Sequence, residues 1–229
     1  MKILAVSDDE SKALWDYYTP DRVKDVDVIV SCGDLRAEYL EFLVTMTGLP
    51  VLYVPGNHDK QYAERPPEGC INIDGKVVTI DGIRFVGFGG SRKYSNGKYM
   101  YTEDQMRTKI CKAKPKIIKN GGVDILVTHA ACRDFGDMED YAHRGFDCFN
   151  EFLERVHPSV MLHGHVHASY RHRNFKRENI HPTGTKVINC YERYIFDFDP
   201  AEKNRIKKKE LSKNLRGAFW TVYPQNIKD

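Results

Sequence analysis

The stretch KILAVSDDE, residues 2–10, joins a short apolar run directly to three consecutive acidic residues. An apolar run of this length, bounded by polar residues, predicts a buried β-strand. Carboxylates that follow one another this closely repel each other, and a bound cation or a proton is needed to offset the repulsion. The stretch therefore predicts a strand that ends at a charged site containing Asp8, Asp9 and Glu10.

Two similar apolar runs follow at Val26–Ser31 and Val51–Val54, and the residues between the three runs have helical periodicity. This alternation predicts a βαβαβ segment, which implies a parallel sheet with crossover helices. From Cys70 to Gly89 the pattern changes to strand-like runs separated by the dipeptides Asp74-Gly75 and Asp81-Gly82. Both dipeptides favour tight hairpin turns, so we expect an antiparallel meander there.

The rest of the pattern predicts a second βα repeat and two closing strands. Thr102-Glu103-Asp104-Gln105 fits a capping box at the start of a helix that we expect to end near Lys112. Further strands are expected at residues 124–128, 159–163, 186–190 and 194–198, and a further helix at residues 146–156. We therefore predict an α/β fold of two packed mixed β-sheets flanked by helices, a four-layer α/β/β/α sandwich.

Length and composition fit one large α/β domain with an ordinary core, since the chain has 229 residues, of which 41% are hydrophobic and 29% charged. We place this domain at residues 1–199. Residues 200–229 form a basic extension that we expect to pack on the domain or to trail from it. The extension contains a run of lysines, Lys207, Lys208 and Lys209, and an aromatic patch, Phe219, Trp220 and Tyr223.

Charge and cysteine content argue against several classes of protein. The net charge of +3 is too small for a strong overall attraction to nucleic acid or to an anionic membrane. The basic segment Lys203–Arg216 leaves nucleic-acid binding as a minor alternative. Six scattered cysteines without a CxxC pair predict reduced thiols. Neither a signal peptide nor a membrane span is recognisable, so we expect a cytoplasmic protein without a membrane partner; the sequence indicates no oligomeric state.

Residues able to bind metal follow one predicted strand after another. They are Asp8, Asp34, Asn57, His58, His129, His165 and His167. Because the carboxyl ends of parallel strands meet at one edge of a sheet, we expect these side chains to converge. Each alone has an ordinary explanation as a helix cap, a turn residue or a structural histidine, but the whole set does not.

The types of donor in this set indicate the kind of metal site. Oxygen and imidazole donors without thiolates suit Mn²⁺, Fe, Zn²⁺ or Mg²⁺ in an open site. So many donors suggest two ions, which in phosphoryl-transfer sites lie about 3.5–4 Å apart. A carboxylate shared between the two ions is then expected.

The order of the motifs resembles that of the calcineurin-like metallophosphoesterase superfamily over roughly residues 1–199. The motifs that carry the resemblance are Ser7-Asp8-Asp9-Glu10, Gly33-Asp34, Gly56-Asn57-His58-Asp59, Thr128-His129 and Gly164-His165-Val166-His167. By motif position, the resemblance implies one ion held by Asp8, Asp34 and His167 and another held by Asp34, Asn57, His129 and His165. It also implies that His58 contacts the phosphate and protonates the leaving oxygen, with Asp59 as a possible orienting partner.

The first motif departs from the usual pattern of the superfamily, which is Asp-x-His, because Glu10 stands at the histidine position. A carboxylate can still bind metal, so we expect Glu10 to be a ligand of the first ion. An anionic ligand in place of imidazole would favour a hard cation such as Mn²⁺ or Mg²⁺. The alternative is that Glu10 points to solvent and the first site is weakly filled.

The resemblance implies hydrolysis of a phosphate ester, which we expect to be a diester, by attack of a metal-bridging hydroxide with His58 as general acid. The expected cofactors are two divalent ions, Mn²⁺ in the first place and otherwise Fe, Zn²⁺ or Mg²⁺. Arg36, two residues after Asp34, is a further candidate contact for the small phosphate-ester substrate. A later basic cluster, Arg171, His172, Arg173, Lys176 and Arg177, is more typical of a solvated loop. The alternative function is a metal-binding scaffold of the same fold without catalysis.

Overall fold

The opening apolar run forms strand β1 (Lys2–Ser7), which is buried on both faces. Ile3 and Ala5 enter a core between two sheets, whereas Leu4 and Val6 pack toward helix α1 (Ala37–Thr47). A strand covered on both faces needs apolar residues at every position, which explains the continuous run. The computed structural model describes residues 1–168, 175–204 and 206–216.

Two sheets make up the centre of the molecule. The first has the strand order β13-β1-β2-β3-β4, and the second has the order β11-β12-β10-β9-β6-β5. The other strands of the first sheet are β2 (Val28–Ser31), β3 (Val51–Tyr53), β4 (Ile71–Asn72) and β13 (Glu192–Asp197). The second contains β5 (Val77–Ile80), β6 (Ile83–Phe88), β9 (Ile125–Thr128), β10 (Val160–His163), β11 (Glu178–Ile180) and β12 (Lys186–Asn189).

Both sheets are mixed, as the sequence predicts. In the first sheet β1 to β4 are parallel and β13 pairs antiparallel with β1. In the second sheet β12, β10, β9 and β6 are parallel, and the edge strands β11 and β5 are antiparallel. The parallel strands of each sheet therefore present their carboxyl ends at one common edge. A small separate pair is formed by β7 (Ser91–Arg92) and β8 (Met100–Tyr101).

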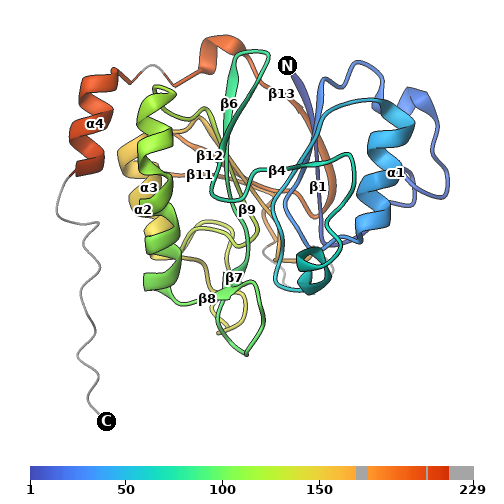
Figure 1. Ribbon diagram of the computed structural model, residues 1–229, viewed down its shortest axis with the longest axis horizontal. Coiled ribbons are helices and arrows are strands. Elements are labelled where there is room, and N and C mark those ends of the chain that lie inside the picture. The colour runs from blue at the N-terminus through green and yellow to red at the C-terminus, as the bar shows by residue number, and fades with distance from the viewer. Residues whose placement is uncertain (169–174, 205, 217–229) are drawn as a thin grey trace.

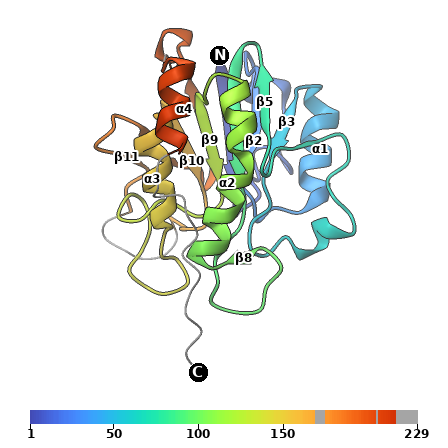
Figure 2. The same ribbon diagram turned by 60° about the vertical axis from the view of Figure 1, so that its left-hand side comes forward.

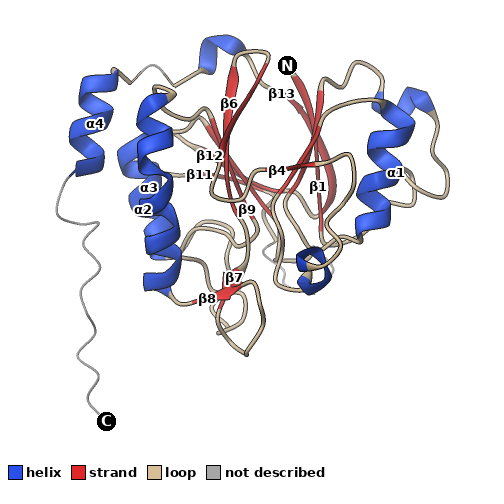
Figure 3. Cartoon of the chain, in the orientation of Figure 1, coloured by secondary structure: helices blue, strands red, loops and turns tan. Residues whose placement is uncertain are grey.

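Helices cover the outer faces of the two sheets and complete the four layers. Figure 1 shows α1 beside the first sheet and, on the opposite side, α2 (Glu103–Lys119), α3 (Asp147–Val156) and α4 (Lys208–Arg216), and Figure 3 shows the strands between them. One apolar core lies between the sheets, and one lies under each helical layer. The predicted α/β/β/α sandwich is confirmed. Short 3₁₀ turns lie at η1 (Pro20–Val23), η2 (Lys60–Ala63) and η3 (Pro200–Glu202).

The first crossover differs from the prediction, because no α-helix joins β1 to β2 in this described part of the chain. The connection consists of turns and η1. Trp15 stacks on Tyr39 of α1 with 5.2 Å between ring centroids, and it lies 5.3 Å from Phe42. The apolar residues that give the segment its helical periodicity therefore pack on α1 one by one and do not form the face of a helix. Pro20 also limits the length of any helix that precedes it.

The predicted meander is only partly correct. Asp81 and Gly82 form the turn between β5 and β6, both with positive φ, 46° and 76°, as a tight hairpin requires. The turn at Asp74-Gly75 instead carries the chain from β4 in the first sheet to β5 in the second. The same dipeptide signal therefore marks a hairpin in one place and a change of sheet in the other.

Helix α2 begins with the predicted capping box but is longer than expected. The Thr102 side chain accepts a hydrogen bond from the Gln105 amide, and the Gln105 side chain accepts one from the Thr102 amide. The helix continues to Lys119 with Pro115 inside it. Ile110, Ala113 and Ile117 are buried on one face, so the apolar stripe extends past the expected end at Lys112.

The basic extension contributes α4 to the helical layer over the second sheet. Leu211 and Leu215 are buried in the core that α4 shares with α2 and α3, and Figure 2 shows the three helices together. The aromatic patch Phe219, Trp220 and Tyr223 and the basic residues Arg171, His172 and Arg173 lie outside the described residues. Among the described residues, no helix combines the length and the apolar character needed to cross a bilayer.

Candidate metal centre

Three of the expected ligands follow their strands in a left-handed backbone conformation. The φ angles of Asp8, Asp34 and His165 are 67°, 56° and 68°. Residues other than glycine rarely adopt this conformation, and such strain is found mainly at functional sites. Asp8 and Asp34 follow strands of the first sheet and His165 follows a strand of the second, so this backbone conformation recurs at expected ligands from both sheets.

Glycines in two of the motifs allow the loops from the two sheets to approach closely. A Cβ atom on Gly56 would overlap the Asp34 carboxylate, and one on Gly164 would overlap the side chains of Ser7 and Asp8. Gly164 and Asp8 follow strands of different sheets. The glycines of the GNHD and GHVH motifs therefore make room for ligands that belong to neighbouring loops.

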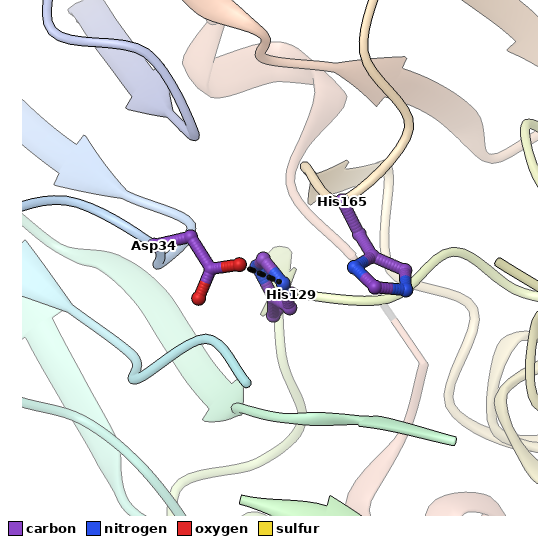
Figure 4. Close-up of side chains that lie close together, drawn as sticks. All are labelled: Asp34, His129 and His165. Atoms are coloured by element: carbon purple, nitrogen blue, oxygen red, sulfur yellow. Dashed lines mark ion pairs between the residues drawn. The ribbon is translucent and has the colours of Figure 1, made fainter. Parts of the chain in front are cut away.

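His129 lies at the centre of the site and is fully buried. Its Nδ1 lies 2.8 Å from the Cys32 carbonyl oxygen, and its Nε2 lies 2.8 Å from Asn57 Oδ1 and 3.2 Å from Asp34 Oδ2. Figure 4 shows the Asp34 and His129 side chains meeting, with His165 beside them. The ligand atoms of Asp34, His129 and His165 all lie within 4.8 Å of one another.

The protonation of His129 tests whether a cation fits this arrangement. A carbonyl oxygen can only accept a hydrogen bond, so the Nδ1 atom of His129 carries a proton and donates it to Cys32. In the neutral ring Nε2 is then an acceptor that faces two further acceptors, Asn57 Oδ1 and Asp34 Oδ2. Three such atoms need a positive charge between them, and this donor set fits a divalent metal ion.

The pKa values show the same need for positive charge. Burial lowers the pKa of His129, but the Asp34 carboxylate outweighs burial and raises it to about 9. Burial raises the pKa of Asp34, but the charge and hydrogen bond of His129 lower it to about 2. Without a cation, a proton on His129 offsets the carboxylate, and a metal ion would take over this role.

His165 is held so that one ring nitrogen remains for the centre. Its Nε2 lies 2.9 Å from the Ala142 carbonyl oxygen and therefore donates to it. Burial, followed by the charge of His129, lowers the pKa of His165 to about 3. The neutral ring thus has its proton on Nε2, and Nδ1 is the nitrogen with a lone pair. Such outer hydrogen bonds commonly orient metal-binding histidines.

Asp8 and His167 lie next to this cluster and to each other. The Asp8 carboxylate accepts hydrogen bonds from the His165 amide at 2.9 and 3.0 Å and from Ser7 Oγ at 2.5 Å. His167 Nε2 lies 3.4 Å from Asp8 Oδ1, and its ring lies 5.1 Å from that of Tyr191. Asp8 is thereby tied to the loop that carries His165.

Glu10 is directed toward Arg36. The two residues form a bidentate ion pair, with Arg36 Nε 2.7 Å from Glu10 Oε1 and Nη2 2.6 Å from Oε2. The Arg36 guanidinium also lies over the Trp15 ring, 5.3 Å from its centroid. Metal binding by Glu10 stays a prediction, and in this structure the carboxylate pairs with Arg36 instead of pointing to solvent.

His58 and Asp59 are placed very differently although they are adjacent. The His58 side chain is 74% exposed, with Nε2 4.0 Å from Asp34 Oδ2. Asp59 is buried and accepts hydrogen bonds from the amides of Gly56 and Asp34 at 2.7 and 2.8 Å. Burial, and then the charge of Asp34, raises the pKa of Asp59 to about 7. Asp59 thus joins the GD and GNHD loops, and in these described loops no hydrogen bond links it to the His58 ring.

Sequence reasoning missed two residues, Tyr94 and His143, that contact the expected ligands. Tyr94 accepts a hydrogen bond from Asn57 Nδ2 at 3.1 Å, which leaves Asn57 Oδ1 directed at His129. The His143 ring lies 4.9 Å from that of His165. Neither residue follows a predicted strand or lies in a motif, so only the fold identifies them.

The family follows from a comparison of sequences. Residues 1–190 match the calcineurin-like phosphoesterase superfamily domain. Because the match spans most of the chain, the chain belongs to this superfamily, whose members are in general phosphoesterase hydrolases that bind divalent metals. The resemblance implied by the motifs is thus confirmed.

The individual relatives share less than a third of their aligned residues with this chain. The chain is 31% identical over 187 residues to the uncharacterized protein MJ1162 of Methanocaldococcus jannaschii, an alignment that covers 74% of this chain and 81% of that protein. It is 28% identical over 179 residues to UPF0046 protein K07C11.7 of Caenorhabditis elegans, covering 65% of this chain and 59% of that protein. Among solved structures, TT1561 of Thermus thermophilus has a TM-score of 0.58 at 17% identity, covering 83% of this chain and 89% of that chain. This last similarity supports the fold alone.

Proposed function

We propose that the chain hydrolyses a phosphate ester, with phosphodiesters as the preferred class, at a centre of two divalent ions. The observation that supports this most is the meeting of three acceptor atoms at His129 Nε2, Asn57 Oδ1 and Asp34 Oδ2. A buried set of acceptors at an otherwise open sheet edge suits a catalytic cation better than a structural one. Manganese is the first candidate, because the donors are oxygen atoms and imidazoles and thiolates are absent.

The residues divide into two ligand sets with one shared member. Asp34 would belong to both, with Asp8 and His167 in the first set and Asn57, His129 and His165 in the second. When bound, such ions would lower the pKa of a coordinated water, neutralise the phosphate and orient it. The chain's own contribution is to hold the ligands in place, since His165 and His129 are each fixed by a carbonyl oxygen on the far side of the ring.

His58 is the proposed proton donor to the leaving oxygen. Its ring is exposed at the edge of the cluster, 4.0 Å from Asp34 Oδ2, where a substrate can reach it. Asp59 supports this role through the backbone, because it ties the loop of His58 to the loop of Asp34. Arg36 is the proposed phosphate contact, with its guanidinium held in one orientation by Glu10.

The experiment that tests the function compares para-nitrophenyl phosphate with its bis ester, both in the presence of Mn²⁺. We expect hydrolysis of both, faster for the bis ester. His58→Ala should lower kcat by about 10² to 10⁴ through loss of the general acid, with unchanged manganese content by elemental analysis. As a control, His157→Asn changes an exposed histidine at the end of α3, before the amino end of β10, and should leave kcat unchanged.

Two results would contradict the proposal in different ways. If His58→Ala kept the wild-type kcat, His58 would not be the general acid. Binding of manganese without hydrolysis of either ester would favour the other candidate function, a metal-binding scaffold.

A further inference from the structure

A cavity of about 970 Å³ opens beside the metal cluster. Its described walls come from the loops after β9 and β10, from β11 and the residues before it, and from the end of β12. They include Met138, His143, Val166, His167, Phe175 and Asn179. His167 lines the cavity and is also a proposed metal ligand, so the cavity adjoins the proposed metal centre. Its volume is far larger than a phosphate group requires.

His143 is fixed at the junction of the cavity and the centre. Its Nδ1 lies 2.8 and 3.0 Å from the two carboxylate oxygens of Asp140. Asp140 Oδ1 also accepts hydrogen bonds from the amides of Ala142 and His143, both at 3.1 Å. An ionised carboxylate only accepts, so His143 Nδ1 bears a proton and the opposite nitrogen, Nε2, is turned away from Asp140.

The same turn holds the metal ligand His165. The carbonyl oxygen of Ala142 accepts the hydrogen bond from His165 Nε2, and the rings of His143 and His165 lie 4.9 Å apart. A phosphate bound at the centre would therefore have His143 beside it, with the organic part of its ester directed into the cavity. The sequence between the motifs gives no sign of this, because neither Asp140 nor His143 follows a strand.

The lining indicates what the organic part can be. Met138, Val166 and Phe175 supply apolar surface, and the polar part of the lining includes Asn179, Asn189, the acidic residues Asp134, Asp137, Glu139 and Asp140, and the basic residues Arg133 and Lys176. We propose that the cavity binds the organic group of the phosphate ester, and that His143, oriented by Asp140, contacts this organic group at the mouth of the cavity. The inference rests on the proposed function and narrows its substrates to esters whose organic group is large enough to occupy the cavity.

Binding of two phosphonates tests the inference without catalysis, because their P–C bond is not hydrolysed. Calorimetry on the manganese-loaded protein would compare benzylphosphonate with methylphosphonate. We expect the benzyl compound to bind at least about tenfold more tightly, since burial of an aromatic ring supplies that much. His143→Ala should reduce this preference, and Asp140→Ala should reduce it less.

A matched control lies in the same turn. Tyr141 is 63% exposed and does not line the cavity, so Tyr141→Ala should keep both affinities and the manganese content of the wild type. Equal affinity of the wild type for the two phosphonates would overturn the assignment of the cavity. Equal weakening of both by His143→Ala would overturn the role of His143. A benzyl preference in a protein that hydrolyses no ester would refute the proposed function while leaving the cavity assignment standing.

Discussion

Arg36 has an exposed guanidinium, yet it is held by three contacts. Glu10 binds it through two parallel hydrogen bonds, and Trp15 lies beneath it. Glu10 follows Asp8 by two residues and Arg36 follows Asp34 by two, so the pair joins the loop after β1 to the loop after β2. A bidentate pair fixes the planar guanidinium in a way that a single contact does not.

The pairing of Glu10 with Arg36 predicts that replacing Glu10 weakens substrate binding more than metal binding. Arg36→Ala should raise KM roughly tenfold by removing a charge-assisted contact to the phosphate, with little change in kcat. Glu10→Ala should raise KM in the same direction and by less, with the manganese content of the wild type. Steady-state kinetics and elemental analysis of the same samples are the measurements. Loss of one ion in Glu10→Ala, and its recovery in Glu10→His, would instead make Glu10 a ligand.

At the residue scale, the motifs predicted which side chains converge, but they did not predict all the residues that contact these side chains. Asp34, His129 and His165 were predictable because each follows a strand of a parallel sheet. The contact between Glu10 and Arg36 was not, because 26 residues separate them and both carry the charge of an ordinary surface residue. The role of Ala142 was equally unpredictable, since it acts through a backbone carbonyl that every residue possesses.

Helix α2 shows how far local sequence determines an element. Its capping box satisfies two backbone amides at the start of the helix, so Thr102→Ala should lower the free energy of unfolding by about 0.5–2 kcal/mol. Thr45→Ala makes the same chemical change inside α1, where the hydroxyl donates to the Glu41 carbonyl oxygen. There alanine is the better helix former, so stability should stay equal or rise slightly. Urea denaturation of both variants checks the contrast, and equal losses would contradict it.

Elements were predictable where two independent signals agreed and less so where only one was present. The start of α2 has both a cap and an apolar stripe, and it begins where expected. The segment between β1 and β2 has periodic apolar residues, but Pro20 limits any helix there, and Trp15 packs on Tyr39 instead of forming part of a helix. Asp74-Gly75 has a turn signal alone, and such a signal does not say which strands the turn joins.

At the scale of the whole molecule, the two sheets each supply part of the centre. Asp34 and Asn57 follow strands of the first sheet, and His129 and His165 follow strands of the second. The fold class was predictable because continuous apolar strands require cover on both faces. How the two sheet edges align was not, because that depends on the side chains that interdigitate between the sheets, such as Ile3, Val30, Phe85 and Val127.

Since its proposed ligands come from both sheets, an ion at this centre should stabilise the whole fold. An unfolded chain does not bring these residues together, so an ion that binds the folded chain adds stability, about 2.7 kcal/mol when its free concentration is a hundred times Kd. Urea denaturation with Mn²⁺ and with a chelator should therefore give a higher midpoint with the ion and the same slope. Asp34→Asn from the first sheet should lose the manganese-dependent shift because Asp34 belongs to both proposed ligand sets, and His129→Gln from the second sheet should reduce it, whatever their stability without metal. Thr45→Ala should retain it. A shift of wild-type size in both ligand variants would place the ion elsewhere, because no ion held jointly by the two sheets can keep its full affinity after losing a ligand from either.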